Sequence, residues 1–202
     1  PTSKALRTYL STIDARQYLV DPAGEWREAT FTTSDLLVAD PTAVASGLAE
    51  TVSRTPDEEW HETLVTAAVR HWEAVESTAT AELEGAILER VVAAAPDPAT
   101  LVVSNSMPVR DLDRFGPPRD ADLTVLGNRG TSGIDGVTST ALGAGSATTD
   151  PLVFVTGDLA YFHDMNGLLA LDRFDLSATI VLIDNDGGGI FHMLPIEAYD
   201  PP

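Results

Sequence analysis

Four short, mostly apolar runs alternate with helical patterns after residue 80, and this alternation constrains the fold more than any other feature of the sequence. The runs cover residues 100–104, 123–126, 152–156 and 179–183, and the helical patterns before them cover residues 80–94, 107–114, 135–147 and 164–171. Strands that are apolar on both faces are typical of a buried parallel sheet whose strands are joined by crossover helices. The sequence therefore predicts an α/β fold with a parallel sheet.

Each expected strand ends in a polar or glycine-rich turn. In open α/β sheets, ligands bind beside the carboxyl ends of the strands, where such turns meet. Four turns of this kind in one sheet indicate a single shared site. They are Ser104-Asn105-Ser106, Gly127-Asn128-Arg129-Gly130, Gly157-Asp158 and Asp184-Asn185-Asp186-Gly187.

The first part of the chain has a different pattern. We expect a short helix at residues 3–10, strands at residues 17–20, 29–33 and 36–38, and then two helices. Asp40 and Pro41 mark the start of the first of these helices, and the second runs from about residue 55 to residue 75. The helical spacing is interrupted at Ser77-Thr78-Ala79-Thr80, so we place a domain boundary between residues 77 and 78.

Composition excludes several classes of protein. The 202 residues include 12 basic and 31 acidic side chains, and the net charge of −19 is the wrong sign for binding nucleic acid or an anionic membrane surface. The chain has no cysteine, which excludes disulfides and thiolate metal sites. It also lacks an apolar run of about 18 residues and a secretory signal, so we expect a cytoplasmic protein without a membrane span.

The two ends of the chain are also informative. The sequence opens at Pro1 without an initiator methionine, and it stops at Pro202 soon after a glycine-rich loop. We therefore expect a segment of a longer polypeptide.

A magnesium site is predicted where two of the strands end. Asp158 follows the run 152–156, and Asn185 follows the next run after one intervening helix. The Asp158 carboxylate, the Asn185 amide oxygen and the Gly187 carbonyl could form one face of an octahedral Mg²⁺, which shares its remaining positions with phosphate oxygens and water. Gly187 and Gly188 would let the backbone approach a diphosphate closely.

Each half of this pattern has a simpler interpretation. Asp158 could cap a helix in an ordinary strand-to-helix turn, and Asn185-Asp186-Gly187 could be a tight turn. The two together, each after a buried strand and one crossover apart, favour a metal–diphosphate site.

With these residues in view, the chain resembles the thiamine diphosphate-dependent enzymes, whose signature runs from Gly-Asp to a later Asn. Within that superfamily it is similar to the 2-succinyl-5-enolpyruvyl-6-hydroxy-3-cyclohexene-1-carboxylate synthases of menaquinone biosynthesis. The resemblance is sharp between about residues 100 and 195 and looser before residue 75. Four stretches carry it: residues 104–113, 128–136, 157–167 and 185–191.

This resemblance implies a domain organisation. Residues 78–202 correspond to the pyrophosphate domain, incomplete at its C-terminus, and residues 1–77 to the end of the central domain with a linker helix. The pyrimidine-binding domain, which carries the family's catalytic glutamate, has no counterpart here. The family forms homodimers or dimers of dimers with the active site at the subunit interface, so we expect a transferase that is active only in the complete protein.

The resemblance also implies a reaction. Thiamine diphosphate attacks 2-oxoglutarate, CO₂ leaves, and the carbanion adds to isochorismate in a 1,4-addition. Arg110 and Arg129 would bind substrate carboxylates, for which a guanidinium is suited. Ile134 resembles the apolar residue that wedges beneath the cofactor and bends it. The expected catalytic residues are therefore Arg110, Arg129 and Ile134.

Further contacts follow from the same resemblance. Asn105 and Ser106 would contact the diphosphate or the substrate, although helix capping is the plainer interpretation. Ile190 and Phe191 would line the thiazolium ring, with Phe191 also near the substrate. Leu159 stands where many thiamine enzymes have a glycine. The expected cofactor-binding residues are Asn105, Ser106, Ile134, Gly157, Asp158, Leu159, Asn185, Gly187, Gly188, Ile190 and Phe191.

Two other functions stay open at this point. One is a thiamine diphosphate enzyme with another substrate, such as an acetolactate synthase-like enzyme or a 2-oxoacid decarboxylase. The other is a cofactor-binding module without catalysis. Two arginines at strand ends favour a dicarboxylate substrate over pyruvate.

Overall fold

The computed structural model describes residues 3–54, 57–78 and 83–199. The chain folds as two compact units, residues 1–70 and residues 71–202. The expected boundary between residues 77 and 78 lies near the end of a helix, and Ala79 and Thr80 lie outside the described residues. The assignment of the two parts to a central and a pyrophosphate domain stays a prediction.

The first unit has a two-stranded parallel sheet, in which β1 (Tyr18–Val20) pairs with β2 (Asp35–Leu37). Helix α1 (Lys4–Thr12) is capped by Ser3, and α2 (Pro41–Thr51) is capped by Asp40, whose carboxylate accepts a 3.0 Å hydrogen bond from the Ala43 amide. Helix α3 (Glu58–Thr78) continues past the division between the units. The helices expected at residues 3–10, after Asp40 and up to about residue 75 are thus confirmed.

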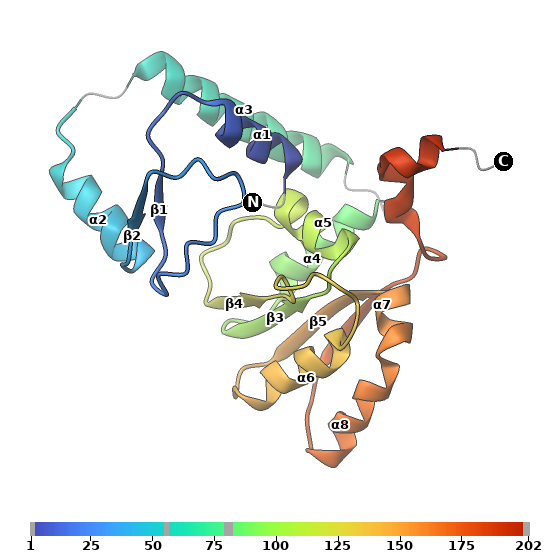
Figure 1. The fold of residues 1–202 in the computed structure, drawn as a ribbon. Helices are drawn as coiled ribbons and strands as arrows, with labels where there is room; N and C mark the ends of the chain where they lie inside the picture. Colours follow the sequence, from blue (N-terminus) through green and yellow to red (C-terminus); the bar gives the residue numbers. More distant parts are fainter. Residues whose placement is uncertain (1–2, 55–56, 79–82, 200–202) are drawn as a thin grey trace. The chain divides into compact units, whose positions relative to one another are not determined.

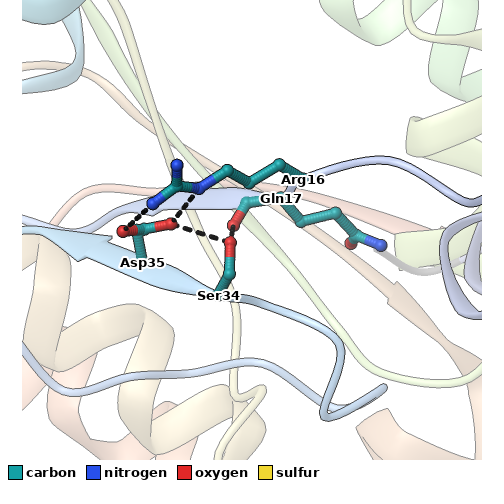
Figure 2. Close-up of polar contacts among 4 residues, drawn as sticks. All are labelled: Arg16, Gln17, Ser34 and Asp35. Carbon is teal, nitrogen blue, oxygen red and sulfur yellow. Dashed lines mark hydrogen bonds and ion pairs between the residues drawn. The ribbon is translucent and has the colours of Figure 1, made fainter.

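Polar contacts hold the two short strands together (Figure 2). The Arg16 guanidinium donates to both carboxylate oxygens of Asp35, at 2.9 and 3.0 Å. The Ser34 hydroxyl bonds to the Gln17 carbonyl at 3.0 Å and to Asp35 at 2.7 Å. The hydrogen bond from Arg16 lowers the pKa of the Asp35 carboxyl, so this pairing holds the carboxylate in its ionised form.

The strand expected at residues 29–33 does not form. The Glu28 carboxylate turns back over this segment and accepts hydrogen bonds from the Thr30 amide and hydroxyl, and from the amides of Thr32 and Thr33. Phe31 has a left-handed φ of 57°. These amides are satisfied by a local side chain, so they do not take part in a sheet ladder.

The second unit is a parallel four-stranded sheet with the order β4-β3-β5-β6. The strands are β3 (Ala99–Val103), β4 (Leu123–Leu126), β5 (Leu152–Gly157) and β6 (Thr179–Ile183), and every pair is parallel. All four lie within a residue of their expected positions. The predicted α/β fold with a parallel sheet is confirmed.

Helices cover both faces of this sheet (Figure 1). Helices α4 (Glu84–Ala94) and α5 (Met107–Phe115) pack on one face, while α6 (Val137–Ser146) and α8 (Leu169–Arg173) pack on the other. Alternate residues of β3 and β5 point to opposite faces, as the period of a strand requires. Leu101 and Val155 lie in the first core and Val102 and Phe154 in the second.

Two expectations about this unit need correction. The helix expected at residues 164–171 is broken into α7 (Asp158–His163), a 3₁₀ turn (Met165–Leu168) and α8, and it begins directly at the end of β5. The central strands β3 and β5 are buried as expected, whereas the edge strand β4 is mostly exposed. The helix expected at residues 80–94 is seen from Glu84 onward, and residues 80–82 lie outside the described part of the chain.

No helix in the part of the chain that the structure describes is long and apolar enough to cross a membrane.

Candidate functional site

The strand order creates a place for a ligand between β3 and β5. From β3 the chain moves outward to β4, then returns to the other side of β3 to form β5 and continues to β6. The connections after β3 and β5 therefore leave the sheet in opposite directions. A crevice opens at such a switch point beside the carboxyl ends of the strands, where open α/β sheets bind ligands.

A pocket of about 170 Å³ lies at these strand ends. It is formed by the turns after β3, β5 and β6, by the loop before α6 and by the first residue of α4. Its lining is mainly apolar with a few polar groups, as is typical of cofactor sites. The lining residues are Glu84, Asn105, Ser106, Met107, Pro108, Ile134, Gly157, Asp158, Leu159, Ala160, Ile183, Asn185, Gly188, Gly189, Ile190 and Phe191.

Most of the residues expected to bind the cofactor meet in this pocket. Those that line it are Asn105, Ser106, Ile134, Gly157, Asp158, Leu159, Asn185, Gly188, Ile190 and Phe191. Gly187 lies just behind the wall, where a Cβ atom would approach the Leu159 side chain to 3.3 Å. Arg110 and Arg129 are not among the described lining residues, and each donates instead to a residue that is.

Asp158 is the first residue of α7 and is partly exposed. Gly157 is the N-cap, so the interpretation of Asp158 as a helix cap is wrong. One carboxylate oxygen of Asp158 accepts the adjacent Leu159 amide at 2.8 Å. A Cβ atom at Gly157 would have open space within 4 Å, which leaves the backbone beside Asp158 accessible from the pocket.

The loop after β6 has an uncommon backbone. Asp186, Gly187 and Gly188 have φ values of 61°, 73° and 71°, so three successive residues lie in the left-handed region that glycine tolerates best. The Gly187 amide donates to the Asn185 side-chain oxygen at 3.2 Å. The Asn185 Nδ2 group donates to the Glu84 carboxylate at 2.8 Å.

The chemistry of these groups fits a hard cation. The Asp158 carboxylate, the Asn185 amide oxygen and the Gly187 carbonyl are oxygen donors of the kind that Mg²⁺ prefers. The described residues contain no cluster of three or more His, Cys, Asp or Glu side chains that could hold a metal. A cation here would therefore need oxygens from a bound ligand or water in addition to these three, as Mg²⁺–diphosphate sites provide.

Asn105 is the junction of the turns after β3 and β4. It is only 1% exposed. Its Nδ2 group donates to the carbonyls of Asn128 and Gly133, at 2.8 and 2.6 Å, and its oxygen accepts a 2.9 Å bond from Arg129. The Gly133 bond fixes the backbone just before Ile134, so Asn105 orients both the expected wedge and an expected substrate-binding arginine.

Ser106 has strained backbone geometry at the pocket wall. Its φ of 73° and ψ of −128° are unfavourable for a residue with a side chain. Arg110 Nη1 donates to the Ser106 carbonyl at 2.5 Å. Ser106 is the N-cap of α5, yet among the described contacts its side chain makes no capping hydrogen bond. Ser106 thus occupies the predicted cap position without a capping bond from its side chain among the described contacts, and Asn105 uses its amide for the three bonds above.

Two acidic residues near the site were not predicted from the sequence. Glu84 begins α4, and Asp111 lies in α5 at 3% exposure. Burial, with a smaller effect of the Glu84 charge, raises the Asp111 pKa to about 6, although Arg114 and Arg110 act in the opposite sense. Asp111 Oδ2 has no hydrogen-bond partner among the described residues.

The comparisons with known proteins agree on one kind of enzyme. No family model matches the chain. Curated 2-succinyl-5-enolpyruvyl-6-hydroxy-3-cyclohexene-1-carboxylate synthases match it at 65% identity over 98% of the chain in Haloarcula marismortui and 61% over 100% in Halobacterium salinarum. The synthase of Bacillus cytotoxicus matches at 41% identity over 96% of the chain.

These matches cover only part of the relatives. The chain spans 33%, 35% and 34% of the length of the three synthases. The chain is homologous, over nearly its whole length, to a segment of the 2-succinyl-5-enolpyruvyl-6-hydroxy-3-cyclohexene-1-carboxylate synthases that makes up about one third of each of these proteins.

Proposed function

We propose that this chain forms the magnesium- and diphosphate-binding half of a thiamine diphosphate-dependent transferase. The complete enzyme decarboxylates 2-oxoglutarate and adds the resulting carbanion to isochorismate in menaquinone biosynthesis. The observation that carries the proposal is the meeting of Asp158, Asn185 and the 187–189 glycine loop at one pocket beside the strand switch point. The reaction product in this proposal is taken from the names of the related synthases.

In this proposal the metal-binding residues come from two adjacent strands. Asp158 and Asn185, with the Gly187 carbonyl, would hold Mg²⁺ together with the diphosphate oxygens. The left-handed backbone at Gly187 and Gly188 would let the main chain approach the phosphate oxygens closely. When bound, thiamine diphosphate supplies the electron sink for the carbanion.

The apolar residues of the lining would exclude water and support the cofactor. Leu159, Ile190 and Phe191 line the pocket and would exclude water from the reacting carbon. Ile134 lines it from the loop before α6 and would support the bent cofactor. The Asn105 bond to the Gly133 carbonyl keeps this support in place.

Substrate carboxylates would be bound by the two arginines that hold lining residues of the pocket without being part of its lining. Arg110 uses Nη1 to hold the Ser106 carbonyl, and Arg129 uses Nη1 to hold Asn105. A guanidinium has five N–H donors, so each arginine can keep its present bond and still bind a carboxylate. Ser106 and Phe191 complete the proposed substrate contacts.

The test uses the full-length protein with 2-oxoglutarate and isochorismate. We expect product only with both thiamine diphosphate and Mg²⁺, and no measurable turnover or metal-dependent cofactor binding after Asp158→Ala. Asp172→Ala, an exposed carboxylate on α8, is the matched control and should behave as the unaltered protein does. Normal turnover in Asp158→Ala would overturn the proposal.

The same protein distinguishes the two alternative functions. A preference for pyruvate over 2-oxoglutarate would indicate an acetolactate synthase-like enzyme or a decarboxylase. Cofactor binding by calorimetry without turnover of any 2-oxoacid would indicate a non-catalytic module. The homodimer or dimer of dimers and the cytoplasmic location stay predictions that follow from this function.

A further inference from the structure

We propose that Glu84 is a positioning residue of the metal site, whose carboxylate holds the Asn185 side chain with its oxygen toward the metal. This inference rests on the proposed function, because it assigns a role to a neighbour of a proposed magnesium ligand. Glu84 itself is not required as a ligand. Its role is to fix which end of the Asn185 amide faces the cation.

The contact joins two distant parts of the chain. Glu84 Oε1 accepts a 2.8 Å hydrogen bond from Asn185 Nδ2, across 101 residues of sequence. Glu84 lies in the first turn of α4, where the helix dipole stabilises a carboxylate, and it lines the same pocket as Asp158 and Asn185. It is therefore held at a fixed point beside the loop that follows β6.

The orientation of the amide follows from its two contacts. A rotation that exchanged the two ends of the Asn185 amide would bring its oxygen against the Glu84 carboxylate, and two acceptors repel. At the other end, the Gly187 amide bonds to the Asn185 oxygen at 3.2 Å. The Asn185 oxygen is thereby held toward the Gly187 amide and away from Glu84.

Such a constraint matters because Asn185 is exposed. An exposed side chain loses rotamer freedom when it binds a metal, and a partner that holds it beforehand lowers that cost. A carboxylate acceptor on Nδ2 also polarises the amide and makes its oxygen a better donor to a cation. Partners of this kind often change metal affinity by roughly 10–100-fold when they are removed.

The first experiment measures Mg²⁺ affinity of the full-length protein by calorimetry with saturating thiamine diphosphate. We expect Glu84→Ala to weaken Mg²⁺ binding by roughly 10-fold or more. Glu84→Gln keeps an oxygen acceptor for Asn185 and should bind within about 3-fold of the unaltered protein. Glu89→Ala, on the same helix, is the matched control and should leave the affinity unchanged.

Each other outcome has a definite meaning. Unchanged affinity in Glu84→Ala would overturn the inference. Equal losses in Glu84→Ala and Glu84→Gln would also overturn it, because they would make Glu84 a direct ligand. If Asp158→Ala abolishes Mg²⁺ binding and Glu84→Ala does not change it, only this inference fails. If the unaltered protein binds no Mg²⁺ with the cofactor, the proposed function fails with it.

A second variant keeps the test decisive if Glu84→Ala does not fold. Asn185→Asp places a carboxylate oxygen against Glu84 and removes the donor, so the two side chains repel. Adding Glu84→Gln to Asn185→Asp restores a donor and removes one charge. We expect the double variant to bind Mg²⁺ more tightly than Asn185→Asp alone, and the reverse order would overturn the inference.

Discussion

The two halves of the strand-end edge are built differently. After β3 and β4, Asn105 is buried and makes three side-chain hydrogen bonds that join the turns, the wedge loop and Arg129. After β5 and β6, Asp158 is partly exposed and Asn185 is exposed. We call these the bonded half and the open half.

The difference indicates what holds the side chains in place in each half. In the bonded half, these hydrogen bonds join residues of the chain to one another, so the fold itself places the expected substrate residues. In the open half, Asp158 and Asn185 line a pocket, and their oxygens would gain further partners from a cation and its diphosphate. Loss of the Asn105 hydrogen bonds should therefore cost stability, and loss of the Asp158 or Asn185 oxygens should cost binding.

The largest effect on stability is expected from Asn105→Ala. The substitution removes the partner of two partly buried carbonyls and of the Arg129 side chain, and a buried polar group left unsatisfied costs about 1–3 kcal/mol. We expect the free energy of unfolding to fall by roughly 3 kcal/mol, measured by urea denaturation of the full-length protein. Asp158→Ala, in the open half, should change it by less than about 0.5 kcal/mol. Equal losses in the two variants would remove the distinction between the halves.

A second effect, dependent on pH, is expected from Asp111→Asn. Burial raises the pKa of Asp111 from 3.8 to about 6, so the folded state favours the protonated carboxyl. That preference stabilises the fold fully below about pH 4 and is lost as pH rises through about 6. Above that pH the ionised carboxylate costs up to about 3 kcal/mol relative to acid conditions.

The variant removes this titration. We expect Asp111→Asn to be more stable than the unaltered protein by about 1–3 kcal/mol at pH 8 and equal to it near pH 4, in denaturation curves at both values. Arg110 and Arg114 lie near this carboxylate and reduce the effect. A stability difference that does not change with pH would contradict the prediction.

The smallest effect is expected from Ser106→Gly. The left-handed φ of Ser106 costs about 1–3 kcal/mol, and glycine removes that strain while adding roughly 0.5–1 kcal/mol of unfolded-chain entropy. We expect a net gain of about 1 kcal/mol in thermal unfolding, together with a lower kcat/KM because the hydroxyl is lost. Ser106→Ala is the control: it also loses the hydroxyl but keeps the strain, so it should not gain stability.

The sequence predicted the strands of the second unit because their signal is local. Apolar runs of this length between turns have few alternatives, and the switch point then brings the turns after β3, β5 and β6 to one pocket, while the turn after β4 is joined to it through Asn105. The helix boundary at Asp158 was missed because its start depends on how β5 ends, which no periodicity records. The strand predicted at residues 29–33 does not form for a similar reason. The Glu28 carboxylate accepts hydrogen bonds from amides that would otherwise donate to a neighbouring strand.

The parts of the site that escaped prediction depend on contacts between distant residues. Glu84 is an ordinary acidic residue at a helix start until the fold places it beside Asn185. Asp111 follows Arg110 on a helix, and only packing buries it. The family resemblance identified Arg110 and Arg129 by motif, yet it could not show that they are outside the pocket lining and donate to Ser106 and Asn105.

The bond between Glu84 and Asn185 also has a consequence for folding kinetics. A contact that spans 101 residues closes one of the longest loops in the second unit, and its entropic cost is met only after the intervening strands have paired. The metal site is therefore among the last features to form as the chain folds. Partly folded chains would have no complete site for Mg²⁺ and diphosphate, so the cofactor should slow unfolding and leave the early steps of folding unchanged.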